Sequence, residues 1–137
     1  MANESPWAIG LVTQDDIVRA RQAGREIARR EGLSIADQTR FATAISELSR
    51  NVILYAWTGQ CEIAVLREDW NVTLTAVVSD SGPGIPDIDR AMSPGFSTGN
   101  GLGAGLPGVR RLMDAFAIDS GTDGTRVEIS LTRRVPR

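Results

Sequence analysis

Two long stretches of the chain repeat apolar residues at intervals of three and four, the spacing typical of amphipathic helices. The first stretch, residues 15–30, carries a stripe of small and aliphatic residues: Ile17, Ala20, Gly24 and Ile27. The second, residues 35–56, carries a stripe of larger ones: Phe41, Ile45, Leu48, Val52 and Tyr55. One face of each predicted helix therefore packs on the core. The arginines of the first helix favour a solvated face, with a partner-docking surface as the alternative.

Shorter stretches alternate apolar and polar residues and predict strands. These stretches are residues 7–12, 61–66, 72–79 and 127–131. The middle two are expected to form an antiparallel hairpin. A third helix is predicted from Pro107 to about Ala117, because its apolar residues again step by three and four. This order of elements predicts an α+β fold, a two-layer sandwich in which a mixed, mostly antiparallel sheet carries three helices on one face.

Length and composition narrow the class of protein. The 137 residues and 14.7 kDa suit one domain, residues 1–137. The formal charge of -2 gives no basic field of the kind that drives binding to nucleic acid or anionic membranes. No apolar run approaches the length needed to span a bilayer, and Cys61 has no second cysteine to pair with. We therefore expect a cytoplasmic protein that binds neither nucleic acid nor membrane.

Two residue types are missing from the chain, and their absence excludes several mechanisms. All 15 basic residues are arginine, and there is no histidine. A Walker-type phosphate loop and a eukaryotic-type protein kinase both require a lysine beside the phosphates. Serine–histidine–acid catalysis and histidine autophosphorylation require a histidine. All of these mechanisms are therefore excluded.

The densest glycine pattern is the stretch from Asp80 to Gly108, DSGPGIPDIDRAMSPGFSTGNGLGAGLPG. Glycine at this density lets backbone N–H groups approach an anionic ligand without a Cβ in the way, so the predicted ligand is a nucleotide phosphate. Gly103, Gly105 and Gly108 also match the dinucleotide-binding pattern G-x-G-x-x-G. That interpretation is disfavoured because the residues before Gly103 are loop-like and no β–α–β unit surrounds them.

Polar residues at the edge of the predicted core complete a candidate site. Glu47 and Asn51 lie one helical turn apart, each directly before a core residue, so both are expected to face a cleft. Asp80 and Thr125 have the inward parity of their strands. Three of them have ordinary alternatives: Glu47 as a charge at the stripe edge, Asp80 as a turn cap, and Thr125 as a β-forming residue. Asn51 is harder to dismiss, because asparagine is unfavourable within a helix.

Four motifs in this order resemble the GHKL ATPase superfamily with its Bergerat ATP-binding fold. They are Glu47…Asn51, Asp80-x-Gly82-x-Gly84, Gly101-x-Gly103-x-Gly105 and Gly124-Thr125. Within that superfamily, the segments ISELSRN, DSGPGIPDI and GFSTGNGLGAGLPGVRRLMD resemble the RsbT-type switch kinases of bacterial stress signalling. These are serine/threonine protein kinases related to anti-sigma factors.

The resemblance implies a role for each matching residue. Asn51 would hold Mg²⁺ against the phosphates of ATP, and Glu47 would orient and deprotonate the attacking hydroxyl. Asp80 would accept from the adenine amino group, supported by Thr125 directly or through water. Arg50 is left open between a phosphate contact and a partner contact. The glycines would surround the nucleotide: Gly82 and Gly84 at the adenine, Gly101, Gly103 and Gly105 at the phosphates, and residues 86–100 as a mobile lid.

The resemblance also implies partners. The substrate would be a STAS-domain antagonist protein of the stressosome, and the kinase, once released from that scaffold, would activate a PPM-type serine phosphatase. An anti-sigma factor that sequesters a sigma factor directly is the alternative. A regulatory module that holds ATP without using it is a third class, which the intact Glu47 and Asn51 disfavour.

Overall fold

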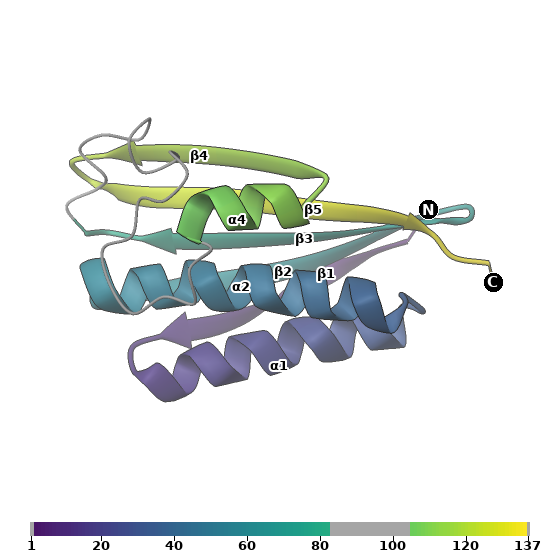
Figure 1. Ribbon diagram of the computed structural model, residues 1–137, viewed down its shortest axis with the longest axis horizontal. Helices are drawn as coiled ribbons and strands as arrows, with labels where there is room; N and C mark the ends of the chain where they lie inside the picture. The colour runs from purple at the N-terminus through teal and green to yellow at the C-terminus, as the bar shows by residue number, and fades with distance from the viewer. Residues whose placement is uncertain (1, 83–104, 137) are drawn as a thin grey trace.

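The computed structural model describes residues 2–82 and 105–136 of the chain (Figure 1). In chain order its elements are β1 (Ala2–Leu11), α1 (Gln14–Arg30), α2 (Ile35–Tyr55), β2 (Gly59–Glu68), β3 (Asn71–Asp80), α4 (Gly105–Leu112), β4 (Ala115–Gly121) and β5 (Gly124–Arg134). Both long helices begin and end within one residue of their predicted bounds.

The strands form a five-stranded sheet in the order β1-β2-β3-β5-β4, and every neighbouring pair is antiparallel. Figure 1 shows α1, α2 and α4 on one face of this sheet, with α2 between the other two. The predicted α+β sandwich with its helices on one face is confirmed. In the part of the chain that the structure describes, the sheet is antiparallel throughout.

The core lies between the sheet and the helices, and strand parity decides which side chains enter it. The inward residues of β3 are at most 2% exposed: Val72, Leu74, Ala76 and Val78. On the helical side, Phe41 and Ile45 of α2 are fully buried. A Cβ at Gly24 of α1 would collide with Ile45 and lie 3.5 Å from the Phe41 ring. Glycine at this position therefore lets α1 and α2 pack closely.

Side-chain hydrogen bonds define where the two long helices start. The Asp16 carboxylate accepts from the backbone N–H groups of Val12 and Thr13, at 2.9 and 3.0 Å. Both hydrogen bonds lower the pKa of Asp16, and the bond from Thr13 has the larger effect. At the start of α2, Ser34 Oγ accepts from the N–H of Asp37 at 3.1 Å.

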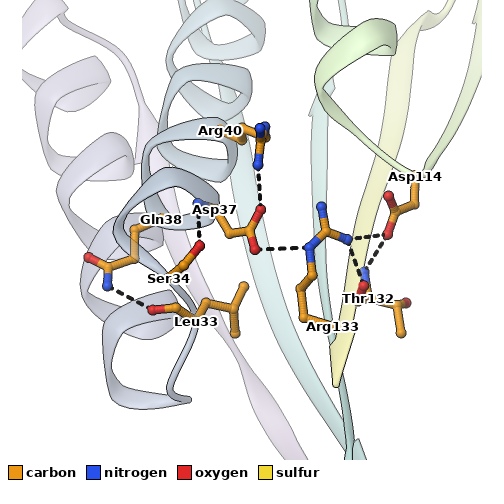
Figure 2. Close-up of polar contacts among 8 residues, drawn as sticks. All are labelled: Leu33, Ser34, Asp37, Gln38, Arg40, Asp114, Thr132 and Arg133. Atoms are coloured by element: carbon orange, nitrogen blue, oxygen red, sulfur yellow. Dashed lines mark hydrogen bonds and ion pairs between the residues drawn. The ribbon is translucent and has the colours of Figure 1, made fainter. Parts of the chain in front are cut away.

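The predicted third helix is wrong at its C-terminal end. α4 ends at Leu112, and Phe116, expected on the helical stripe, lies instead in β4. Asp114 changes the direction of the chain: its N–H donates to Ser130 O at 3.0 Å, and its carboxylate accepts from the N–H of Thr132 at 2.8 Å (Figure 2). Phe116 fits the helical spacing of apolar residues, but pairing with β5 places it in a strand, because tertiary contacts outweigh local preference.

The first strand is longer than its predicted range, residues 7–12. It starts at Ala2, and a register shift separates Glu4 from Trp7, on either side of Pro6. Proline has no N–H to donate to a neighbouring strand, so it is tolerated at an irregularity of an edge strand. This irregularity interrupts the alternation that strand prediction depends on.

Candidate functional site

The C-terminal half of α2 carries the predicted acid and amide. Glu47 is buried, with 4% of its surface exposed, and Asn51 is half-buried one turn later. The guanidinium of Arg50 donates to Glu47 Oε1 at 2.8 Å. No residue in the described ranges donates to the second oxygen, Oε2. Glu47 is therefore not an ordinary solvated charge, since a buried carboxylate requires a partner or a function.

Asp80 and Thr125 lie directly opposite each other, where β3 ends and β5 begins. Each continues the inward parity of its strand, as the sequence predicted. The Thr125 hydroxyl lies 2.7 Å from the hydroxyl of Ser120 in β4. Ser120 was missed because β4 itself was not predicted. The alternation of Phe116 and Ile118 is the sequence signal that would have found the strand, and Ser120 continues the same parity.

Asp80 also takes part in a local turn. Its Oδ1 accepts from the N–H of Gly82 at 2.9 Å, the turn-capping contact that the sequence offered as an alternative. Its Oδ2 has no donor among the residues that the structure describes. Because a carboxylate can accept through both oxygens, the turn contact and a ligand contact are compatible.

Close packing at two glycines joins the end of β3 to α2. A Cβ at Gly82 would lie 2.6 Å from Cβ of Ala56, the C-cap of α2. A Cβ at Gly59 would lie 2.7 Å from Cγ1 of Val52 and 3.2 Å from Cβ of Asp80. Val52 directly follows the asparagine of the candidate pair. The aspartate at the strand end and the asparagine-bearing turn of α2 therefore border the same region.

Two further glycines of the motifs have a left-handed backbone. Gly124 opens β5 with φ +141°, and a Cβ there would collide with the carbonyl oxygen of Asp80. Gly105 opens α4 with φ 54°. Both conformations favour glycine, and at Gly124 the clash excludes a Cβ as well. The remaining predicted site residues lie outside the described residues: Gly84, Gly101, Gly103 and the expected lid, 86–100.

The described side chains fit a nucleotide better than a protein-only metal site. Within residues 2–82 and 105–136, no group of three or more acidic, cysteine or histidine side chains could hold a metal ion. The Asn51 amide supplies one oxygen beside the buried Glu47. One such ligand suits Mg²⁺, which is commonly held by one or two protein groups together with substrate phosphates and water. The donors present therefore fit magnesium carried on a nucleotide.

Comparison with known proteins decides the family. A model of the histidine kinase-like ATPase domain matches residues 12–131. The chain belongs to this family. The serine/threonine-protein kinase RsbT of Bacillus subtilis is 49% identical over 121 residues, which cover 88% of this chain and 91% of that protein. The anti-sigma F factor of the same organism is 33% identical over 138 residues, covering 95% of this chain and 92% of that protein.

Solved structures of the family share the fold. The RsbU and RsbW domains of Rv1364c from Mycobacterium tuberculosis match with a TM-score of 0.65 and 19% identity over 96% of this chain. This chain spans 34% of that one. The mycobacterial sensor histidine kinase MprB matches with a TM-score of 0.54 and 18% identity, covering 98% of this chain and 100% of that one. At these identities the likeness concerns the fold alone.

Within the family, the chain lies in the RsbT-like branch of protein serine/threonine kinases, as the motifs predicted. It is an ATP-binding kinase domain whose relatives act through partner proteins. None of the helices in the described ranges has the length and hydrophobicity that crossing a bilayer requires.

Proposed function

We propose that this protein is an ATP- and Mg²⁺-dependent serine/threonine kinase of a bacterial stress-response partner-switching module. It phosphorylates a STAS-domain antagonist protein of the stressosome and, when released from that scaffold, activates a PPM-type serine phosphatase. The observation that carries the proposal is the buried Glu47 of α2, one turn before Asn51, on the helix whose C-terminal end packs against the end of β3.

Glu47 is the proposed catalytic base. Phosphoryl transfer depends mainly on positioning the reacting groups and stabilising charge. The substrate hydroxyl oxygen bonds to the γ-phosphorus, the bond from that phosphorus to the leaving oxygen of ADP breaks, and ADP keeps the electron pair. The hydroxyl proton passes to Oε2 of Glu47, the oxygen that no described residue occupies. This assignment gives the buried carboxylate a chemical role.

The remaining site residues are proposed to hold the nucleotide. Asp80 accepts from the adenine amino group through Oδ2, and Thr125, whose hydroxyl contacts Ser120, supports it from the next strand. The Asn51 amide oxygen would hold Mg²⁺, which would neutralise phosphate charge in a chain that has no lysine to do so. Gly82 and Gly84 would let the chain pass close to the adenine. Backbone N–H groups would complete the phosphate contacts at Gly101, Gly103 and Gly105.

The decisive experiment is a transfer assay with candidate substrates. The protein is incubated with Mg-ATP and with STAS-domain antagonist proteins from the same organism, and phosphorylated residues are mapped by mass spectrometry. We expect one serine or threonine of one antagonist to be modified. Glu47→Ala should lose this transfer, and Glu26→Ala is its matched control, because Glu26 is also an acid three residues before an arginine but lies exposed on α1. No transfer to any STAS-domain protein under saturating Mg-ATP would refute the substrate assignment.

A second candidate function is that of an anti-sigma factor. The 33% identity to the anti-sigma F factor over 95% of this chain supports it. In that case the main activity is direct sequestration of a sigma factor, with the kinase activity secondary. Size-exclusion chromatography with the sigma factors of the same organism separates the two functions. A stable complex with a sigma factor favours the second candidate, whereas a complex with a PPM-type phosphatase favours the first.

A further inference from the structure

Arg50 lies against Glu47, and it is less exposed than the arginines of the other described helical pairs with i,i+3 spacing. Its Nη1 is 2.8 Å from Glu47 Oε1, and its side chain is 26% exposed. Arg50 directly precedes Asn51, the proposed magnesium ligand, but its guanidinium reaches back one helical turn to Glu47, the proposed base. Within the described residues, the guanidinium therefore bonds to the acid of the same helix.

Three other pairs with the same spacing show what an ordinary helical ion pair looks like here. In the pairs Asp16–Arg19, Glu26–Arg29 and Asp37–Arg40, the arginine side chains are 68%, 61% and 47% exposed. Of the three acids, only Glu26, at 53%, is exposed, and an exposed pair such as Glu26–Arg29 contributes little because both charges stay hydrated. Arg50 is about half as exposed as the least exposed of these three arginines, and its partner Glu47 is 5% exposed. This contact therefore fixes a carboxylate that water does not hold in place.

The bond also selects which oxygen of Glu47 is available. Oε1 is held by the guanidinium, and Oε2 has no donor in the described part of the chain. The contact is a single charge-assisted hydrogen bond from Nη1, which orients the carboxylate without occupying Oε2. We infer that Arg50 is a positioning residue for phosphoryl transfer, which holds Glu47 through Oε1 so that Oε2 receives the proton of the substrate hydroxyl. This inference rests on the proposed function, and specifically on Glu47 as the base.

A double-mutant cycle tests the inference. Arg50→Ala and Arg50→Lys are prepared in the parental chain and in Glu47→Gln. Two rates are measured with Mg-ATP: transfer to the STAS-domain substrate, and release of inorganic phosphate by the protein alone, where water replaces the protein hydroxyl. ATP affinity is measured by calorimetry and the melting temperature by thermal unfolding. Arg29→Ala is the matched control, because its i,i+3 pair is exposed and lies on α1.

We expect Arg50→Ala to lower kcat about tenfold or more, the loss typical of one charge-assisted hydrogen bond, while ATP affinity stays close to the parental value. The melting temperature should fall, because the buried Glu47 loses its partner, so all rates are compared below the unfolding transition. Arg50→Lys should recover part of the loss, because a cation remains within reach of Oε1. In the Glu47→Gln background, Arg50→Ala should cause no further loss, since Arg50 acts through the carboxylate.

Three results would overturn the inference. An ATP affinity that falls as much as kcat would make Arg50 a phosphate contact. An equal loss in the Glu47→Gln background would show that Arg50 acts independently of the acid. If Glu47→Gln lowers kcat but Arg50→Ala leaves it unchanged, Glu47 remains the proposed base and Arg50 does not position it. Parental rates for Glu47→Gln itself would instead refute the proposed base, and this inference with it.

Discussion

The helix α2 carries two buried carboxylates with the same local spacing and different surroundings. Asp37 is 8% exposed and Glu47 is 4% exposed, and each lies three residues before an arginine. Arg40 donates to Asp37 Oδ1 at 2.7 Å, much as Arg50 donates to Glu47 Oε1 at 2.8 Å. Local sequence therefore does not distinguish the two acids.

The second oxygen distinguishes them. Asp37 Oδ2 accepts from Nε of Arg133 in β5 at 2.9 Å, and Arg133 also bonds to the carboxylate of Asp114 at 2.9 Å (Figure 2). This network ties the start of α2 to β5 and to the junction of α4 with β4. Glu47 Oε2 has no such donor among the described residues. A buried carboxylate with both oxygens engaged stabilises the fold, whereas one with an open oxygen is available to a ligand.

The largest effect is expected from Glu47→Ala. Loss of a general base typically slows a reaction about 10²- to 10⁴-fold, and ATP affinity should be largely kept because the nucleotide contacts lie elsewhere. Transfer rates and calorimetry with Mg-ATP measure the two quantities. Arg50, at 26% exposure, can still reach water, so the fold should persist. If Glu47→Ala transfers phosphate at the parental rate, Glu47 is a structural acid like Asp37, and the contrast between the two acids is wrong.

Asp37→Ala should show the opposite pattern. It removes the hydrogen bonds from Arg40 and Arg133, but these side chains are 47% and 31% exposed and can be rehydrated. We therefore expect a destabilisation of about 2 kcal/mol, below the ~3–5 kcal/mol of a broken, fully buried ion pair. Urea unfolding measures the free energy. The variant should retain the parental kcat below its melting temperature, and a selective loss of kcat would mean that Asp37 serves the site as well.

The contribution of Asp37 should also depend on pH. Burial alone would raise the pKa of Asp37, but hydrogen bonds from Arg133 and Arg40 and the charge of Arg133 outweigh it and lower the pKa below the ordinary value of 3.8. A lowered folded-state pKa gives a contribution that is present above the unfolded-state value and is lost as the pH falls through the folded-state value.

Unfolding free energies of the parental protein and Asp37→Asn, measured from about pH 7 to about pH 3, should therefore converge at the acid end. The pKa of Asp16 is also lowered, mainly by its backbone hydrogen bonds. The parental protein and Asp37→Asn should therefore both lose the stability that Asp16 contributes as the pH falls. A difference between them that stays constant across this range would show that the Asp37 pairs do not titrate as the structure predicts.

The sequence predicted those features that depend on local spacing. The stripe of α2 placed Glu47 and Asn51 on one helical edge, and the parity of β3 placed Asp80 inward. The Asp37–Arg133 contact joins residues 96 positions apart, so no local pattern could reveal it. Arg50 was within reach of local reasoning, since it lies at i+3 from Glu47. Its burial, which decides its role, required the packed structure.

The segment after α4 shows a second limit. Phe116 extends a helical spacing and also begins an alternation with Ile118, so apolar pattern alone allowed either element. The hydrogen bonds of Asp114 to β5 decide in favour of the strand. That error concealed Ser120 and its contact with Thr125. The wrong end of the third helix is thus the reason why Ser120 was not predicted as part of the candidate site.

The C-terminal end of α2, beyond Asn51, retains a source of instability that its N-terminal end lacks. Ser34 caps the start of the helix, whereas Trp57 follows its end with φ 73° and 78% of its surface exposed. A left-handed conformation costs a residue with a side chain about 1–2 kcal/mol. Relieving the backbone strain at Trp57 should therefore raise the free energy of unfolding.

The smallest expected effect is therefore a gain from Trp57→Gly. Glycine removes the strain, and little burial is lost because the indole is exposed, but the greater freedom of glycine in the unfolded chain offsets about 0.5–1 kcal/mol. The net gain should be about 0.5 kcal/mol, measured by urea unfolding. Trp57→Ala is the control, because it removes the indole and keeps the strain. If both variants lose stability equally, the indole makes a stabilising contact and α2 is reinforced at both ends.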